Sequence, residues 1–196
     1  MIENGLTAAQ HKMRDAGVAE QAITVFTHYY QSLEAGATGL IPEETIEPLT
    51  DIDSIDDVEI SEADAREALS RTVMIKLNGG LGTSMGMDRA KSLLPVRDGK
   101  SFLDLLVDQV MAARRTYGVS LPLIFMDSFR TRDDTLAALA EHPGIAVGGL
   151  PLDFLQNREP KLRADDLTPV TWEADPGLEW CPPGHGDIYT SLWSSN

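Results

Sequence analysis

A short apolar run that ends at an asparagine and opens into a glycine-rich loop constrains this chain more than any other feature. The run is TVMIKL, residues 72–77, and Asn78 follows it. Four glycines fall within residues 79–86, and Lys91 comes five residues after the last of them. Glycine lets backbone amides approach a ligand without side chains in the way. A strand followed by such a loop and a lysine therefore indicates a phosphate-binding site.

Two common phosphate-binding loops do not fit this spacing. The Walker pattern places its lysine directly after the last glycine, whereas Met87 follows Gly86 here. The dinucleotide pattern G-x-G-x-x-G is missed because the glycine after Gly80-Leu81-Gly82 comes one position late. A plain strand-to-helix turn is the simpler alternative, but it needs only one or two glycines.

Beyond the loop, strand-like and helix-like segments alternate. Residues 102–118 and 131–140 have helical patterns, the second capped by Ser128 or Thr131, and a further helix starts in 185–195. Residues 121–128 read as a strand, and 144–156 carry one or two more. This alternation predicts an α/β fold with a mixed, mostly parallel sheet and flanking helices. Ligands bind beyond the carboxyl ends of such strands, which points to loops 78–91, 127–131 and 181–187.

The N-terminal third follows a different pattern. Apolar residues recur at helical spacing from 6 to 34 and predict one long helix there. Residues 36–60 are rich in Pro, Thr and acids and read as a connecting arm, after which Ser61 starts a short helix to Ser70.

Charge and cysteine content exclude some classes of protein. The net charge is −15, and residues 42–67 hold eleven acids against one base, Arg66. Such a surface repels nucleic acid, and the arm is either a solvated linker or a docking segment. With Cys181 alone, no internal disulfide forms, which favours a cytoplasmic protein. The sequence shows no leader and no membrane-spanning run, so we expect no membrane partner.

Five motifs, in order along the chain, carry a resemblance to a known family. They are LNGGLGTSMG (77–86), KSLLPVRDGKSFLDLLVDQV (91–110), LPLIFMDSF (121–129), FLQNREPKL (154–162) and CPPGHGDIY (181–189). Over roughly residues 72–196 they resemble the UTP–glucose-1-phosphate uridylyltransferases (UDP-glucose pyrophosphorylases) of the eukaryotic-like type. The resemblance implies a Rossmann-like nucleotidyltransferase fold of the GT-A type, truncated to an N-terminal fragment. Residues 1–71 would form an N-terminal helix and acidic arm, and residues 72–196 the first part of the catalytic domain.

The resemblance also implies a reaction. UMP would pass from UTP to glucose 1-phosphate, giving UDP-glucose and pyrophosphate, with Mg²⁺ as cofactor. The family's metal-binding aspartate is expected beyond residue 196, so no metal ligand is expected within this chain. A UDP-sugar or UDP-N-acetylhexosamine pyrophosphorylase and a non-catalytic UTP-binding fragment stay open as alternatives. The activity of the isolated chain and its oligomeric state, including a homo-oligomer, stay open as well.

The motifs assign site residues by resemblance. The nucleotide-binding set is Leu77, Asn78, Gly79, Gly80, Gly82, Thr83, Lys91, Met126, Gln156 and Gly184. Glucose 1-phosphate would meet Gly79, Gly80 and His185, and Lys91 would be the catalytic residue that neutralises the phosphates. The Gln156 amide offers a donor and an acceptor, which suits the reading of uracil.

Read without the family, three of these residues have ordinary explanations. Lys91 would be a solvated lysine, Gln156 a polar strand end and His185 a helix cap. Two positions depart from the family pattern: Ala90 stands where members commonly have proline, and Asp127 where they usually have asparagine. We assign no site role to Asp127, and we read Cys181 as a neighbour of the loop and not as a nucleophile.

Overall fold

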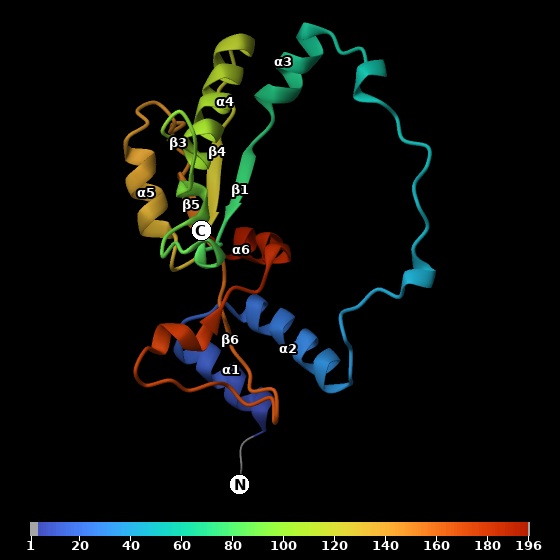
Figure 1. Ribbon diagram of the computed structural model, residues 1–196, viewed down its shortest axis with the longest axis vertical. Helices are drawn as coiled ribbons and strands as arrows, with labels where there is room; N and C mark the ends of the chain where they lie inside the picture. Colours follow the sequence, from blue (N-terminus) through green and yellow to red (C-terminus); the bar gives the residue numbers. More distant parts are fainter. Residues whose placement is uncertain (1–3, 196) are drawn as a thin grey trace.

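The computed structural model describes residues 4–195, arranged as two packed units and a long arm (Figure 1). The sheet unit comprises residues 74–156. The helical unit combines residues 5–34 with residues 157–181, so it is built from two stretches far apart in the sequence. The arm, residues 36–60, leaves the helical unit and returns to the sheet unit along one side of the molecule (Figure 1).

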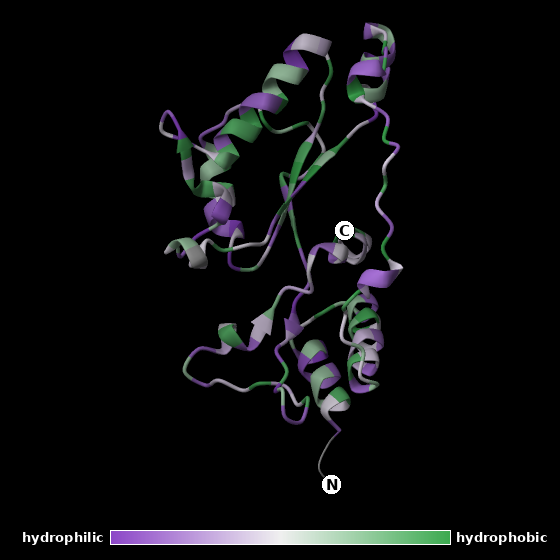
Figure 2. Cartoon of the chain, turned by 45° about the vertical axis from the view of Figure 1, so that its right-hand side comes forward, coloured by the Kyte–Doolittle hydropathy of each residue, from purple (hydrophilic) through white to green (hydrophobic). Residues whose placement is uncertain are grey.

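The sheet unit is built on three parallel strands, β1 (Met74–Asn78), β4 (Leu123–Asp127) and β5 (Asp153–Leu155), in the order β1-β4-β5. The predicted α/β fold with a parallel sheet is confirmed. The helices α4 (Phe102–Tyr117) and α5 (Arg132–Ala140) pack on it around a core that includes Phe125. Apolar residues gather along these strands and on α4 in Figure 2. The strands β2 (Pro95–Arg97) and β3 (Lys100–Ser101) form an antiparallel hairpin before α4.

Local sequence signals set the ends of several helices. Ser101 and Asp104 form a capping box at the start of α4, and Gly118 ends it with a left-handed φ of 62°. Ser61 caps α3 (Glu62–Ser70), as predicted. Thr131, one of the two expected caps, precedes α5, but its hydroxyl lies against Ser128 and caps no helix amide.

The single helix predicted over residues 6–34 is wrong. The structure has two helices, α1 (Gly5–Asp15) and α2 (Glu20–Glu34). Gly17 adopts a φ of 73°, and the amide of Val18 donates to the Met13 carbonyl at 3.0 Å. This is the hydrogen bond of a Schellman motif, which ends a helix at a glycine. The apolar spacing continues across the turn, which is why the pattern alone missed it.

The helical unit joins both of its stretches through specific contacts. Buried residues of α1 and α2, among them Met13 and Phe26, pack with Leu162, Leu167 and Trp180. The antiparallel pair β6 (Glu159–Pro160) and β7 (Trp180–Cys181) lies here, and α6 (Ile188–Ser194) follows. Contacts of α6 with both α2 and β5 connect the two units.

The arm has almost no regular structure, as predicted. It contains two short 3-10 turns, Glu43–Thr45 and Ile55–Asp57, and its side chains are exposed. Within residues 4–195, no helix combines the length and apolar character that crossing a membrane requires.

Candidate functional site

The parallel register brings three polar residues side by side at the carboxyl edge of the sheet. Asn78 is the register partner of Asp127, and the Gln156 amide continues the ladder by donating to the Asp127 carbonyl at 2.8 Å. The Asn78 side-chain Nδ2 donates to Asp127 Oδ1 at 2.9 Å and to Thr135 Oγ1 at 2.8 Å. These bonds fix the Asn78 amide at the start of the glycine loop.

The glycine loop is closed on itself, which brings Lys91 back to the strand end. Leu81 pairs with Ala90 in an antiparallel bridge, and the Lys91 amide donates to the Gly80 carbonyl at 3.0 Å. The Ala90 amide donates to Asp134 Oδ2 at 3.2 Å and so ties the loop to the first turn of α5. A proline at position 90 has no amide hydrogen, so this tether depends on the departure from the family pattern.

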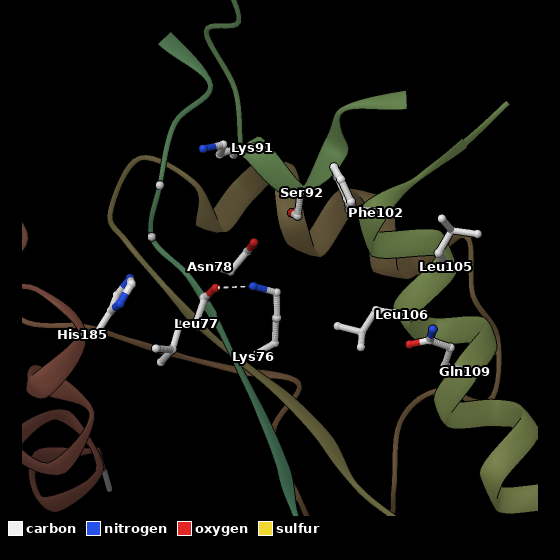
Figure 3. Close-up of a pocket in the computed structure, with 12 residues that line it drawn as sticks. Lys76, Leu77, Asn78, Lys91, Ser92, Phe102, Leu105, Leu106, Gln109 and His185 are labelled. Atoms are coloured by element: carbon white, nitrogen blue, oxygen red, sulfur yellow. Dashed lines mark hydrogen bonds between the residues drawn. The ribbon is translucent and has the colours of Figure 1, made fainter. Parts of the chain in front are cut away.

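A cavity of about 670 Å³ opens between the loop, α4 and residue 185. Six of the predicted site residues line it: Leu77, Asn78, Gly79, Gly80, Lys91 and His185. Its other lining residues are Lys76, Ser92, Phe102, Leu105, Leu106 and Gln109. Figure 3 shows His185 on one side of the β1 end and α4 on the other, with Lys91 and Ser92 along the rim. The volume suits a ligand of nucleotide size.

Gln156 reaches this site through Gly79. A Cβ built on Gly79 would lie 2.7 Å from both Nε2 and Oε1 of Gln156, so the glutamine amide rests against the glycine backbone. Gln156 is buried, and its Nε2 has no partner among the described side chains and backbone. An amide held in this way keeps a donor free for a ligand.

Besides Gln156, four predicted residues do not line the main cavity. Gly82 packs against the Met87 side chain, and Thr83 lies exposed in a 3-10 turn of the loop. Met126 is only 1% exposed, in the middle strand of the sheet. Gly184, with a left-handed φ of 109°, lines a neighbouring cavity of about 380 Å³ that shares His185.

Asp187 positions the loop that carries Gly184 and His185. Its Oδ2 accepts from the Asn157 amide at 2.7 Å, and its Oδ1 accepts from Asn157 Nδ2 at 2.9 Å. Asn157 follows Gln156 directly, so the loop is anchored to the end of β5. Sequence reasoning missed this pair. Its members are thirty residues apart, and only their presence in two neighbouring motifs hinted at it.

Burial shapes the acid-base properties around the site. It raises the pKa of Asp127 to about 6, although hydrogen bonds from Asn78 and Thr135 oppose the shift. Burial, followed by the charge of Asp187, raises the pKa of Glu159 to about 7. Burial also raises the pKa of the Cys181 thiol, which keeps it protonated and disfavours a role as nucleophile.

Comparisons with known proteins show what the chain is similar to. A family model described as UTP–glucose-1-phosphate uridylyltransferase matches residues 23–196. The enzyme of that name from Solanum tuberosum is 41% identical over 135 residues, which cover 68% of this chain and 28% of the relative. A probable UTP–glucose-1-phosphate uridylyltransferase from Schizosaccharomyces pombe is 39% identical over 152 residues, covering 76% of this chain and 30% of the relative.

Solved structures give the same result. A mutant UDP-glucose pyrophosphorylase from Leishmania major, in complex with UDP-glucose, superposes with a TM-score of 0.87 at 42% identity. It matches 98% of this chain and 40% of that one. A UDP-glucose phosphorylase from Trypanosoma brucei superposes with a TM-score of 0.80 at 40% identity, matching 97% of this chain and 39% of its own. The chain thus spans under a third of these curated relatives and about two fifths of the solved ones.

Proposed function

Since the chain belongs to the UTP–glucose-1-phosphate uridylyltransferase family, we propose that it forms the UTP-binding part of an enzyme that transfers UMP from UTP to glucose 1-phosphate. The products are UDP-glucose and pyrophosphate. One observation carries the proposal: the folded chain brings Leu77–Gly80, Lys91 and His185 around a single cavity at the end of β1.

The reaction needs positioning and charge neutralisation more than covalent chemistry. A phosphate oxygen of glucose 1-phosphate attacks the α-phosphorus of UTP, and the bond from that phosphorus to the bridging oxygen of the β-phosphate breaks. Pyrophosphate leaves with the electron pair, so no enzyme nucleophile is required. The protein must hold two polyanions in line and offset the charge that develops between them.

Lys91 supplies the positive charge in this proposal. Among the ion pairs of residues 4–195, none involves its ammonium, so it is available to phosphate. The backbone at Gly79 and Gly80 lies open to the same cavity, and a Cβ at Gly80 would meet no protein atom within 4 Å. These groups would receive the phosphates, with Gly82 and Thr83 in the loop around them.

Gln156 and His185 discriminate the two substrates. The Gln156 amide lies against Gly79 with a free donor, which fits pairing with a uracil edge. His185, which lies across the β1 end from α4, would bind the phosphate of glucose 1-phosphate. Gly184, which lines the neighbouring cavity, completes the proposed nucleotide contacts, whereas the role of Met126 rests on the resemblance alone.

Mg²⁺ belongs to the proposed reaction as a charge-neutralising cofactor of the whole catalytic domain. The residues of this chain do not fit a metal centre. Within residues 4–195, no three His, Cys, Asp or Glu side chains come together where they could hold a metal ion.

Two alternatives to the glucose enzyme stay open. A UDP-sugar or UDP-N-acetylhexosamine pyrophosphorylase would use the same UTP half-site, and kinetics with several sugar 1-phosphates separate these from the glucose enzyme. The short span of the chain relative to its relatives favours testing UTP binding without turnover as the second candidate. A cytoplasmic location is proposed on the sequence alone, and the oligomeric state stays open.

Calorimetry of the chain with UTP and ATP tests the proposal. We expect UTP to bind about tenfold or more tightly than ATP, because a purine presents the wrong hydrogen-bonding edge to Gln156. Gln156→Ala should reduce the preference, and Lys91→Ala should weaken both nucleotides, since both carry a triphosphate. Equal affinity of the unmodified chain for UTP and ATP would remove Gln156 from its role.

A further inference from the structure

Ser92 has a buried hydroxyl that the fold leaves without a partner. The residue is 8% exposed, and its Oγ makes no hydrogen bond to any described group. A buried hydroxyl without a hydrogen bond destabilises the folded state. The other buried serines that the structure describes, Ser128 and Ser191, have hydrogen-bonded hydroxyls, so the unpaired hydroxyl of Ser92 is an exception among them.

The position of Ser92 indicates which group could accept a hydrogen bond from its hydroxyl. It follows Lys91 in the same 3-10 turn, Lys91–Leu93, and both residues line the main cavity. Figure 3 shows Ser92 between Lys91 and Phe102, with the Lys91 side chain directed away from it. A hydroxyl and an ammonium can both donate hydrogen bonds, and an anionic oxygen is the ligand group that accepts well from either of them.

We propose that Ser92 is a further ligand-binding residue, whose hydroxyl donates to a phosphate oxygen of a nucleotide in the cavity that Lys91 also lines. The proposal rests on the proposed function, because it assigns a contact within the same UTP site. It also explains why a buried serine has no hydrogen-bond partner in the free protein, because the ligand would supply the acceptor.

The test combines stability with affinity in the Ser92→Ala variant. Removing an unpaired buried hydroxyl should leave the Tm of the free protein unchanged or higher. The same change should weaken UTP binding by about tenfold, the value of one hydrogen bond to a charged group, and leave uridine binding unchanged. Calorimetry with UTP, UDP and uridine, and thermal denaturation without ligand, measure these effects.

Ser128→Ala is the matched control. Ser128 is buried as well, but its hydroxyl is paired with Thr131 Oγ1 at 3.0 Å and it does not line the cavity. This variant should show the opposite behaviour, with a lower Tm and normal UTP affinity. Ser92→Cys keeps the size of the side chain but donates weakly, so it should bind UTP as poorly as Ser92→Ala.

The outcomes separate the two proposals. A lower Tm for Ser92→Ala would show that the hydroxyl has a structural partner, and equal losses for UTP and uridine would place the contact away from phosphate. Normal UTP affinity of Ser92→Ala, with weak binding by Lys91→Ala, would overturn the role of Ser92 and leave the proposed function standing. An unmodified chain that binds no UTP would instead count against the proposed function, and against the Ser92 contact with it.

Discussion

In the helical unit, polar side chains beside the core are paired across long stretches of the sequence. The Tyr30 hydroxyl donates to the Leu167 carbonyl at 3.1 Å, and Arg158 donates to the Ala16 carbonyl at 2.9 Å. In the sheet unit, three buried side-chain atoms have no partner among the described groups: Ser92 Oγ, Asp127 Oδ2 and Gln156 Nε2. None of the described atoms of this kind lies in the helical unit.

This difference separates a structural region from a candidate ligand site. Buried polar atoms without a hydrogen bond destabilise the folded state. They are therefore expected chiefly at functional sites, where a ligand can supply the missing hydrogen bond. Two of the three belong to residues at the cavity. Ser92 lines it, and the Gln156 amide lies against Gly79, which lines it as well. The helical unit, with its polar groups satisfied internally, instead holds two distant parts of the chain together.

The largest expected effect tests whether the two units are separate. Phe125 is fully buried in β4, and Phe125→Ala should lower the free energy of unfolding by about 3–5 kcal/mol through the cavity it leaves. Hydrogen exchange should show β1 and β4 losing more protection than α1 and α2. Val96→Ala, at an exposed position, is the control and should change stability by less than about 0.5 kcal/mol. Equal loss of protection in both units would mean that they unfold as one.

A smaller loss of stability is expected from the ion pair that links the two stretches of the helical unit. Lys12 Nζ donates to the Val170 carbonyl at 2.7 Å and pairs with Glu179, whose carboxylate also accepts from the Trp172 amide. Lys12→Met should lower the Tm by a few degrees at neutral pH. Arg14→Met is the control, because Arg14 and its partner Glu20 are both largely exposed and should contribute little.

The pH dependence of this variant checks the cause. The hydrogen bond from Lys12, and then that from Trp172, lower the pKa of Glu179. The pair therefore contributes stability above the ordinary glutamate pKa, and this contribution is lost as the pH falls through the lowered value. Melting curves should show the gap between Lys12→Met and the unmodified chain narrowing below about pH 4. A gap that is constant with pH would instead point to the contacts of Lys12 that do not titrate here, its hydrogen bond to Val170 and its position over the Trp180 ring.

The smallest expected effect has the opposite sign and lies in the sheet unit. Burial raises the pKa of Asp127 to about 6, so its charged form is disfavoured by folding. The penalty is absent near pH 4, grows as the pH rises, and is complete above about pH 6. Asp127→Asn should therefore raise the Tm by about 2 °C at pH 7.5, with a gain that shrinks as the pH falls towards 4.

Asp153→Asn is the matched control on the neighbouring strand. Asp153 is also buried, but Arg132 Nε donates to its Oδ2 at 2.6 Å. Neutralising Asp153 removes an ion pair and should lower the Tm. Neutralising Asp127, which has hydrogen bonds but no ion pair among the described residues, should raise it. If Asp127→Asn also lowered the Tm above pH 6, the hydrogen bonds from Asn78 and Thr135 would outweigh burial, and the sheet unit would resemble the helical unit.

Local sequence signals were enough to define several elements. Ser101 and Asp104, three positions apart, form the capping box that starts α4, and Gly118 directly follows its last residue. The parallel sheet followed from alternation, and the motifs placed Gly79, Gly80 and Lys91 in one loop. Local spacing failed at Gly17, where one residue with positive φ turned an expected helix into two while the apolar spacing ran on.

Contacts between residues far apart in the sequence became visible in the tertiary structure alone. Gln156 rests on Gly79, Asn157 binds Asp187, and Lys12 pairs with Glu179, because strand register and helix packing bring these positions together. Which buried polar groups find partners follows from the same packing. The open hydroxyl of Ser92 and the raised pKa of Asp127 could not be read from residue types, because desolvation depends on every atom that surrounds the group and not on its neighbours in the chain.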